Sequence, residues 1–158
     1  MTSTMADPMT STDRIEKKVV LRAPVSRVWQ AIADSKQFGE WFRVKLNAPF
    51  APGRKVQGKI TIPNYEHIQF EMEVERVEPQ SYFSYRWHPY AIDPKTDYSK
   101  EPTTLVEFRL EEVKDGTALT ITETGFDRIP AARRAEAFRM NDNGWAGQAK
   151  QIAAYVEK

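Results

Sequence analysis

The sequence predicts an α+β fold in which a curved antiparallel sheet of about six strands wraps on one long C-terminal helix, with two short helices after the first strand. Three observations support this prediction. Apolar and polar residues alternate through a series of short segments between residues 15 and 125, as half-buried strands require. Turn signals, among them Asp115-Gly116, separate the later segments. After Pro130 the apolar residues recur at every third or fourth position, which indicates a helix.

The bulk composition is that of one ordinary globular domain. The chain has 158 residues, of which 41% are hydrophobic and 28% charged, and this length suits a single domain. The net charge of +1 provides no overall field for nucleic acid or an acidic membrane. Without cysteine, the chain can form no disulfide and no cysteine-ligated metal site. We therefore expect a cytoplasmic protein with no nucleic-acid partner, no membrane insertion and no cofactor.

The N-terminus differs in composition from the rest. Residues 1–12 are rich in Ser, Thr and Met and contain no apolar stretch of the kind found in signal peptides. We predict a disordered leader over residues 1–12, followed by a single domain over residues 13–158.

The first strand and the two short helices follow this leader. Alternation over residues 15–22 predicts a half-buried strand, and Pro24 suits the first position of a helix. Asp34-Ser35 interrupts this helix, so a second short helix is expected over residues 36–41. The apolar face of the first helix comprises Val25, Val28, Trp29 and Ile32.

Five further strands are predicted between residues 55 and 125. In the clearest of them, residues 68–76, apolar residues share one face and glutamates the other, which marks the glutamate side as solvated. Residues 88–102 contain three prolines and are expected to form a long loop, a feature that is often functional. The other four strands are expected over residues 55–62, 83–87, 104–113 and 117–125.

One long helix is predicted over residues 131–156. Gly144 and Gly147 weaken it, each by about 1 kcal/mol relative to alanine, unless they serve close packing or a bend. The helix has only the apolar face of the sheet to cover. Its inward stripe comprises Phe138, Asn141, Trp145, Ala149, Ile152 and Val156.

Several short motifs occur in a recognisable order. Residues 23–32 read Ala-Pro-Val-Ser-Arg-Val-Trp-Gln-Ala-Ile, and Trp41-Phe42 follows. Further matches are the strands at 83–87 and 117–126 and the Asn-Gly-Trp at 143–145. Together these motifs resemble the START/polyketide-cyclase superfamily, also called SRPBCC, over nearly everything from residue 15 to the end. The most similar branch is named after the activator of heat-shock-protein-90 ATPase.

The resemblance implies a helix-grip fold and leaves several functions open. The superfamily includes lipid and hormone carriers, cyclases, dehydratases and chaperone cofactors. We expect a protein that binds a small hydrophobic or aromatic ligand in a cavity between the sheet and the C-terminal helix, without catalysis. One alternative is a cyclase- or dehydratase-type enzyme, and another is an interaction protein that resembles the chaperone ATPase activators. Those activators carry an additional N-terminal domain, for which a short leader leaves no room, so a chaperone partner is less favoured.

Glu123 is the candidate for a catalytic acid or base. By alternation it shares a face with Leu119 and Ile121, where a carboxylate is costly to bury unless it is hydrogen-bonded or neutralised. A buried carboxyl acquires a raised pKa and can then serve in acid–base chemistry. The alternatives are a solvated position at the strand end and a structural hydrogen bond to Trp145, Tyr85 or a backbone amide.

The other expected ligand-binding residues are Asn141 and a set of aromatic side chains. Asn141, on the inward stripe of the last helix, can satisfy Glu123 or hold the polar end of a ligand. His67 and His88 have no neighbours at metal-binding spacing, so no zinc site is predicted. Aromatic residues at these spacings are usually core, and we expect about half of them only to pack. The aromatic candidates are Trp41, Phe42, Phe70, Tyr85, Trp87, Phe108, Phe138 and Trp145.

Overall fold

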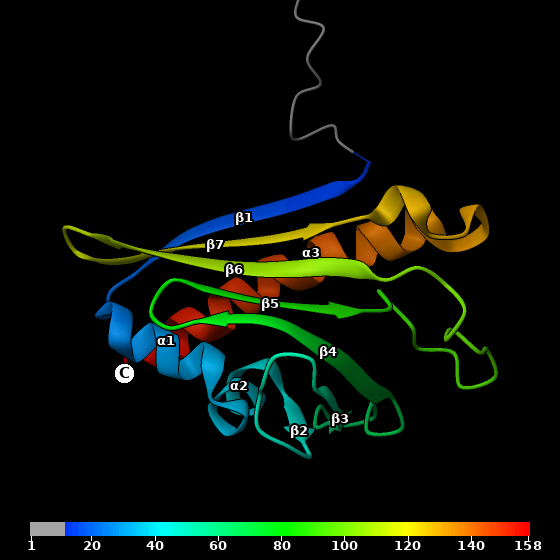
Figure 1. Cartoon of the computed structure of the whole chain (residues 1–158), viewed down its shortest axis with the longest axis horizontal. Helices are drawn as coiled ribbons and strands as arrows, with labels where there is room; N and C mark the ends of the chain where they lie inside the picture. The colour runs from blue at the N-terminus through cyan, green and yellow to red at the C-terminus, as the bar shows by residue number, and fades with distance from the viewer. Residues whose placement is uncertain (1–11) are drawn as a thin grey trace, which may run out of the picture.

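The computed structural model of the protein describes residues 12–158, so all but the last residue of the expected leader lies outside the described residues. Within them, one antiparallel sheet of seven strands packs its inner face against helices (Figure 1). The strands are β1 (Arg14–Leu21), β2 (Val44–Leu46), β3 (Lys55–Ile60), β4 (Gln69–Glu78), β5 (Tyr82–Trp87), β6 (Thr104–Val113) and β7 (Gly116–Thr124). The helices are α1 (Val25–Ala33), α2 (Ser35–Phe42), the short 3-10 helix η2 (Phe126–Arg128) and α3 (Ala131–Val156).

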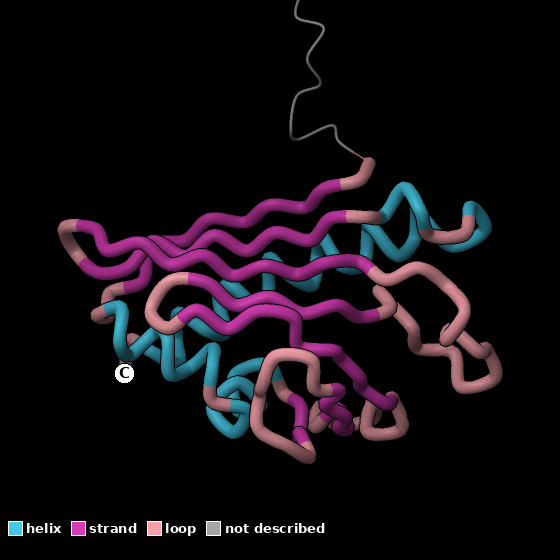
Figure 2. The backbone as a smooth tube through the Cα atoms, in the orientation of Figure 1, coloured by secondary structure: helices cyan, strands magenta, loops and turns pink. Residues whose placement is uncertain are grey.

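The strand order is β1-β7-β6-β5-β4-β3-β2. Strands β2 to β7 follow one another as neighbours along the chain, while β1 pairs with β7, so the first and last strands in sequence lie side by side at one edge of the sheet. The long helix α3 runs behind the sheet and crosses several strands on the same side (Figure 2). This arrangement confirms the predicted α+β helix-grip fold.

The seventh strand, β2, is the strand that the sequence did not predict. It has three residues, too few for a period-two pattern to show, and it is held by antiparallel pairing with β3. Gly39 of α2 makes this approach possible, because a Cβ there would lie 2.2 Å from the carbonyl oxygen of Val44. Tertiary contact, rather than local propensity, therefore forms this strand.

The two glycines of α3, unlike Gly39, do not lie against another element. A Cβ placed on Gly144 or Gly147 would meet nothing within 4 Å. Close packing is therefore not the reason for either glycine, and that part of the expectation is wrong.

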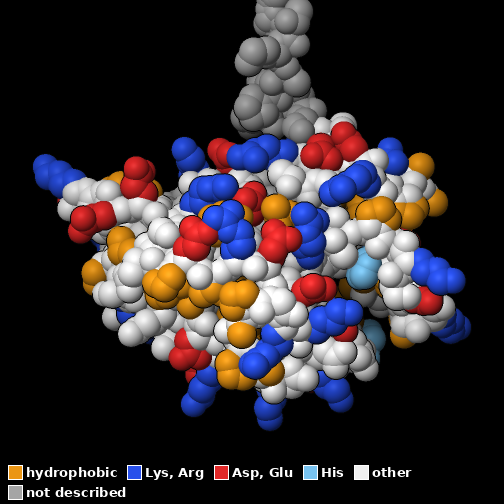
Figure 3. Space-filling view, in the orientation of Figure 1, with side chains coloured by type: hydrophobic (Ala, Val, Ile, Leu, Met, Phe, Trp, Pro, Cys, Tyr) orange, Lys and Arg blue, Asp and Glu red, His pale blue; other side chains and the backbone are white. Residues whose placement is uncertain are grey.

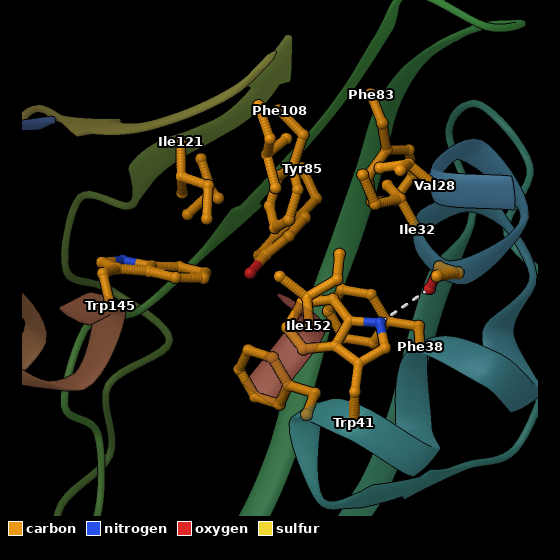
Figure 4. Packing of buried hydrophobic residues seen from close by; sticks show 14 of the residues in the cluster. Val28, Ile32, Phe38, Trp41, Phe83, Tyr85, Phe108, Ile121, Trp145 and Ile152 are labelled. Carbon is orange, nitrogen blue, oxygen red and sulfur yellow. Dashed lines mark hydrogen bonds between the residues drawn. The ribbon is translucent and has the colours of Figure 1, made fainter. Parts of the chain in front are cut away.

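The core between sheet and helices is rich in aromatic rings (Figure 4). Phe38 of α2 is fully buried and stacks on Phe42 with ring centroids 4.9 Å apart. The Trp41 indole N–H donates to the Ala31 carbonyl at 2.8 Å and so ties α2 to α1. None of the described helices combines the length and apolarity that crossing a membrane requires.

Candidate functional site

Glu123 lies on the inner face of β7 and is completely buried. Its register partners are Ile15 on β1 and Val106 on β6, and Val106 in turn faces Tyr85 on β5. Glu123, Val106 and Tyr85 therefore form one row across three adjacent strands, directed toward the helices. The alternation of β7 predicted this inward face, because side chains two residues apart share a face.

Four side chains donate hydrogen bonds to the Glu123 carboxylate. Trp145 of α3 donates its indole N–H to Oε1 at 2.8 Å, and the Asn141 amide donates to the same oxygen at 2.9 Å. The other oxygen, Oε2, accepts from the Trp87 indole at 2.7 Å and from the Thr104 hydroxyl at 2.6 Å. The network thereby joins β5, β6 and β7 to α3 at one point.

The donors and the burial act on the Glu123 pKa in opposite directions. Burial raises the pKa above the usual glutamate value, while the hydrogen bonds from Thr104, Trp87, Trp145 and Asn141 lower it. The balance is a raised pKa. Indole and amide N–H groups can only donate, so their geometry fits the ionised carboxylate.

The raised pKa of Glu123 predicts how stability depends on pH. The folded protein holds this proton more tightly than the unfolded chain, so the stabilisation is complete below the ordinary pKa of 4.5 and is lost as pH rises through the raised value. We expect the free energy of unfolding of the wild type to fall relative to that of Glu123→Gln as pH rises above 4.5. Urea unfolding of both proteins across a pH series measures this difference, and a difference independent of pH would contradict the prediction.

Tyr85 places a second polar group beside this network. Its ring is fully buried, and its hydroxyl has no hydrogen-bond partner among residues 12–158. Burial, followed by the charge of Glu123, raises the pKa of this hydroxyl well above its usual value. In Figure 4 the hydroxyl points toward Trp145 and Ile152. Of the hydrogen-bond partners considered for Glu123, the structure thus supplies Trp145 and not Tyr85.

Most of the expected aromatic residues form one cluster around these polar groups. The Trp87 ring lies 5.8 Å from that of Trp145 and 5.3 Å from that of Tyr85, and Phe42 lies 6.0 Å from Trp145, all between centroids. Phe70 contacts Phe42 and Trp87, while Trp41 and Phe108 contact each other. Phe138 lies elsewhere, with its ring 5.1 Å from that of Phe126 beside η2.

Two residues of the site were missed from the sequence. Thr104 begins β6 and shares the inward face of Val106 and Phe108, so alternation was the available signal. That signal does not reveal the hydrogen bond to Glu123, which joins two different strands. Gln148 lies one turn after Trp145 and donates to the Phe42 carbonyl at 3.2 Å, while its buried Oε1 has no partner within the described residues. Helical spacing from Trp145 was the available signal for Gln148, but glutamine on a mostly polar helix reads as surface.

The long loop after β5 is held against the start of α3. Arg133 donates to the Glu101 carboxylate at 2.7 and 2.9 Å and to the Pro89 carbonyl at 2.7 Å. Its guanidinium also lies 4.8 Å from the centre of the Tyr98 ring. His88 contacts the Glu101 carbonyl at 3.0 Å, so this histidine belongs to the loop closure.

Two surface grooves lie outside this inner site. One, of about 710 Å³, crosses the outer face of the sheet and is lined by residues that include Val20, Tyr82 and Arg109. Figure 3 shows this face, where cationic and anionic side chains are intermixed. The other, of about 400 Å³, lies between β1 and α3, beside Ala149 and Lys150. Neither groove is lined by Glu123 or Tyr85.

Solved structures share the whole fold. DynU16, described as a protein of the dynemicin biosynthetic locus, is 25% identical with a TM-score of 0.71, and the match covers 92% of this chain and 48% of DynU16. The chain thus spans about half the length of DynU16. Protein MLL2253 of Mesorhizobium loti is 22% identical with a TM-score of 0.71, over 90% of this chain and 96% of that one. A protein of Arthrobacter aurescens reaches a TM-score of 0.74 at 17% identity, over 98% and 90% of the two chains.

The family comparison agrees with the motifs. A search of curated proteins found no significant match. The family model described as "Activator of Hsp90 ATPase homolog 1-like protein" matches residues 22–157, which is most of the chain and includes every residue of the Glu123 network. The chain therefore belongs to the family of Activator of Hsp90 ATPase homolog 1-like proteins, a branch of the SRPBCC superfamily.

Proposed function

We propose that the protein binds a small, largely apolar ligand between the inner face of the sheet and α3. The observation that carries this proposal is the Tyr85 hydroxyl, which is fully buried next to the Glu123 network and has no partner in the described range of residues 12–158. An unpaired buried hydroxyl costs free energy, which a bound ligand can recover by forming the missing hydrogen bond. Gln148 offers a second unpartnered polar atom on the facing helix.

The surroundings of Tyr85 have the composition of a small-molecule site. Such sites are lined mainly by aromatic and apolar side chains, with a few polar groups that orient the ligand. Phe42, Phe70, Trp87 and Trp145 supply the apolar part. Because these rings contact one another, a ligand enters by separating them, and the half-buried Trp87 and Asn141 lie at the accessible end.

The same geometry argues against Glu123 as an acid–base catalyst. A catalytic carboxyl must reach the substrate proton within hydrogen-bonding distance. Glu123 is fully buried, and both of its oxygens already accept hydrogen bonds from fixed donors. Its role in the proposed function is to hold Trp87, Asn141 and Trp145 in place. Association with a chaperone stays a prediction from the family resemblance. No contact observed among residues 12–158 adds support to it.

The indole N–H groups provide a direct test. We expect the neutral fluorophore N-phenyl-naphthylamine to bind saturably and to shift the Trp87 and Trp145 indole signals in the proton–nitrogen NMR spectrum, since both indoles border the site. The indole of Trp29, on α1, is the internal control and should not move.

Assignment of these signals uses one Trp→Phe variant for each tryptophan. Shifts confined to backbone amides of the outer groove, such as Val20 and Arg109, would place the probe on the wrong face of the sheet and refute the proposal. Saturation without movement of the Trp87 or Trp145 indoles would refute it as well.

A further inference from the structure

We infer that the inner site selects ligands that carry a positive charge on an apolar frame, such as aromatic or alkyl amines, and rejects carboxylates. This inference rests on the proposed function and adds to it the chemical class of the ligand. It follows from three features of the site: an unneutralised buried carboxylate, a cluster of aromatic rings, and two unpartnered polar oxygens.

When ionised, Glu123 brings a negative charge into the core, and no cationic side chain of residues 12–158 forms an ion pair with it. Among the buried side chains of residues 12–158, Glu123 is the only Asp, Glu, Lys or Arg. Four hydrogen-bond donors stabilise the carboxylate, but uncharged donors leave the net charge in place. In a site with little water, an approaching anion is repelled and a cation is attracted more strongly than at the surface.

The aromatic cluster favours the same sign of charge. The faces of Trp, Tyr and Phe rings carry negative electrostatic potential and attract ammonium groups, most strongly when water is excluded. The centroid of the Trp87 ring lies 5.3 Å from that of Tyr85 and 5.8 Å from that of Trp145, and the Phe42 centroid lies 6.0 Å from that of Trp145. A cation among these rings also lies close to Glu123, because Trp87 and Trp145 bind that carboxylate directly.

The unpartnered atoms complete the match to an ammonium group. Gln148 Oε1 can only accept a hydrogen bond, because an amide oxygen carries no hydrogen, and the amide nitrogen of the same side chain donates to the Phe42 carbonyl. The Tyr85 hydroxyl oxygen can accept as well. An ammonium group has only donors to offer and can pair with either oxygen, whereas a carboxylate offers only acceptors and cannot pair with Gln148 Oε1.

A series of three compounds on one frame tests the inference by isothermal titration calorimetry. The probes are naphthalene-methylamine, naphthalene-methanol and naphthalene-carboxylate, titrated at a pH of about 8, where the amine stays largely protonated. The expected order of affinity is amine, then alcohol, then carboxylate. We expect the amine to bind at least about tenfold more tightly than the carboxylate, because a Glu123 carboxylate a few ångströms away attracts the ammonium group and repels the carboxylate.

Matched variants assign the discrimination to Glu123. In Glu123→Gln the difference in affinity between the amine and the carboxylate should become smaller, because the buried charge is gone. Glu107→Gln is the control, because Glu107 lies on the outer face, where it accepts from Tyr82 and Thr122, and its loss should leave that difference unchanged. If Glu123→Gln fails to fold, the order of the three compounds on the wild type decides the inference alone.

The possible failures can be told apart. Carboxylate binding as tight as that of the amine would overturn the inference while leaving the proposed function intact. The same difference in affinity between amine and carboxylate in Glu123→Gln as in the wild type would also overturn the inference, because the selectivity would then have another source. If none of the three compounds binds, the proposed function is wrong, and the inference is wrong with it.

Discussion

Glu123→Ala should lower the free energy of unfolding by about 3–5 kcal/mol, because it removes the common acceptor of a buried network. The two indole N–H groups, the Asn141 amide and the Thr104 hydroxyl would then be left without their partner. Each unsatisfied buried donor costs about 1–3 kcal/mol, and relief of the buried charge offsets part of this sum. Urea unfolding followed by tryptophan fluorescence measures the change.

Glu107→Ala is the matched control for this substitution. Glu107 is also a strand glutamate that accepts side-chain hydrogen bonds, from Tyr82, Thr122 and Arg109, but its side chain is 14% exposed on the outer face. Water can replace its partners, so we expect a loss of about 1 kcal/mol. If Glu123→Ala lowers the free energy of unfolding no more than Glu107→Ala does, the hydrogen bonds to Glu123 do not stabilise the fold.

Trp145→Ala should cost a similar amount, about 3–5 kcal/mol, for a different reason. The ring is 2% exposed and contacts Phe42, Trp87 and Phe108, so its removal leaves a cavity where α3 meets the sheet. It also removes one donor from Glu123. Chemical unfolding measures the loss, and the probe N-phenyl-naphthylamine should bind more weakly to whatever fraction stays folded.

Trp145→Phe separates packing from hydrogen bonding. Phenylalanine keeps most of the ring contacts and lacks the indole N–H, so the expected cost is about 1–2 kcal/mol. A loss as large as that of Trp145→Ala would assign the effect to the hydrogen bond. An unchanged unfolding midpoint in Trp145→Ala would show that α3 does not depend on this side chain.

The strands and the long helix could be predicted because each carries its own periodic signal. The alternation of apolar and polar residues in β4 and β7, and the spacing of apolar residues in α3, indicate which face of each element is buried. These patterns do not depend on which element packs against that face. β2 has only three residues and exists because β3 and Gly39 accommodate it, so no local signal could reveal it. The glycines of α3 show the converse limit, since the sequence could not tell close packing from open space.

The candidate site divides in the same way. The inward position of Glu123 followed from alternation, and Asn141 was correctly considered as its partner. Thr104 and Gln148 were missed, and Phe138 was grouped with rings that it does not contact. These outcomes depend on distances between elements that are far apart in the chain, which spacing within an element does not specify.

By itself, the sequence determined the fold class, the order of most elements and the face on which Glu123 lies, because period and turn chemistry are local properties of the chain. Only the tertiary structure decided that four donors, between 18 and 36 residues away in sequence, converge on that carboxylate. It also decided that the Tyr85 hydroxyl near that carboxylate, and Gln148 Oε1 on α3, are left without partners in the part of the chain that the structure describes. The physical reason is that hydrogen bonding and burial depend on strand register and on where α3 crosses the sheet, and both are set by packing the whole core at once.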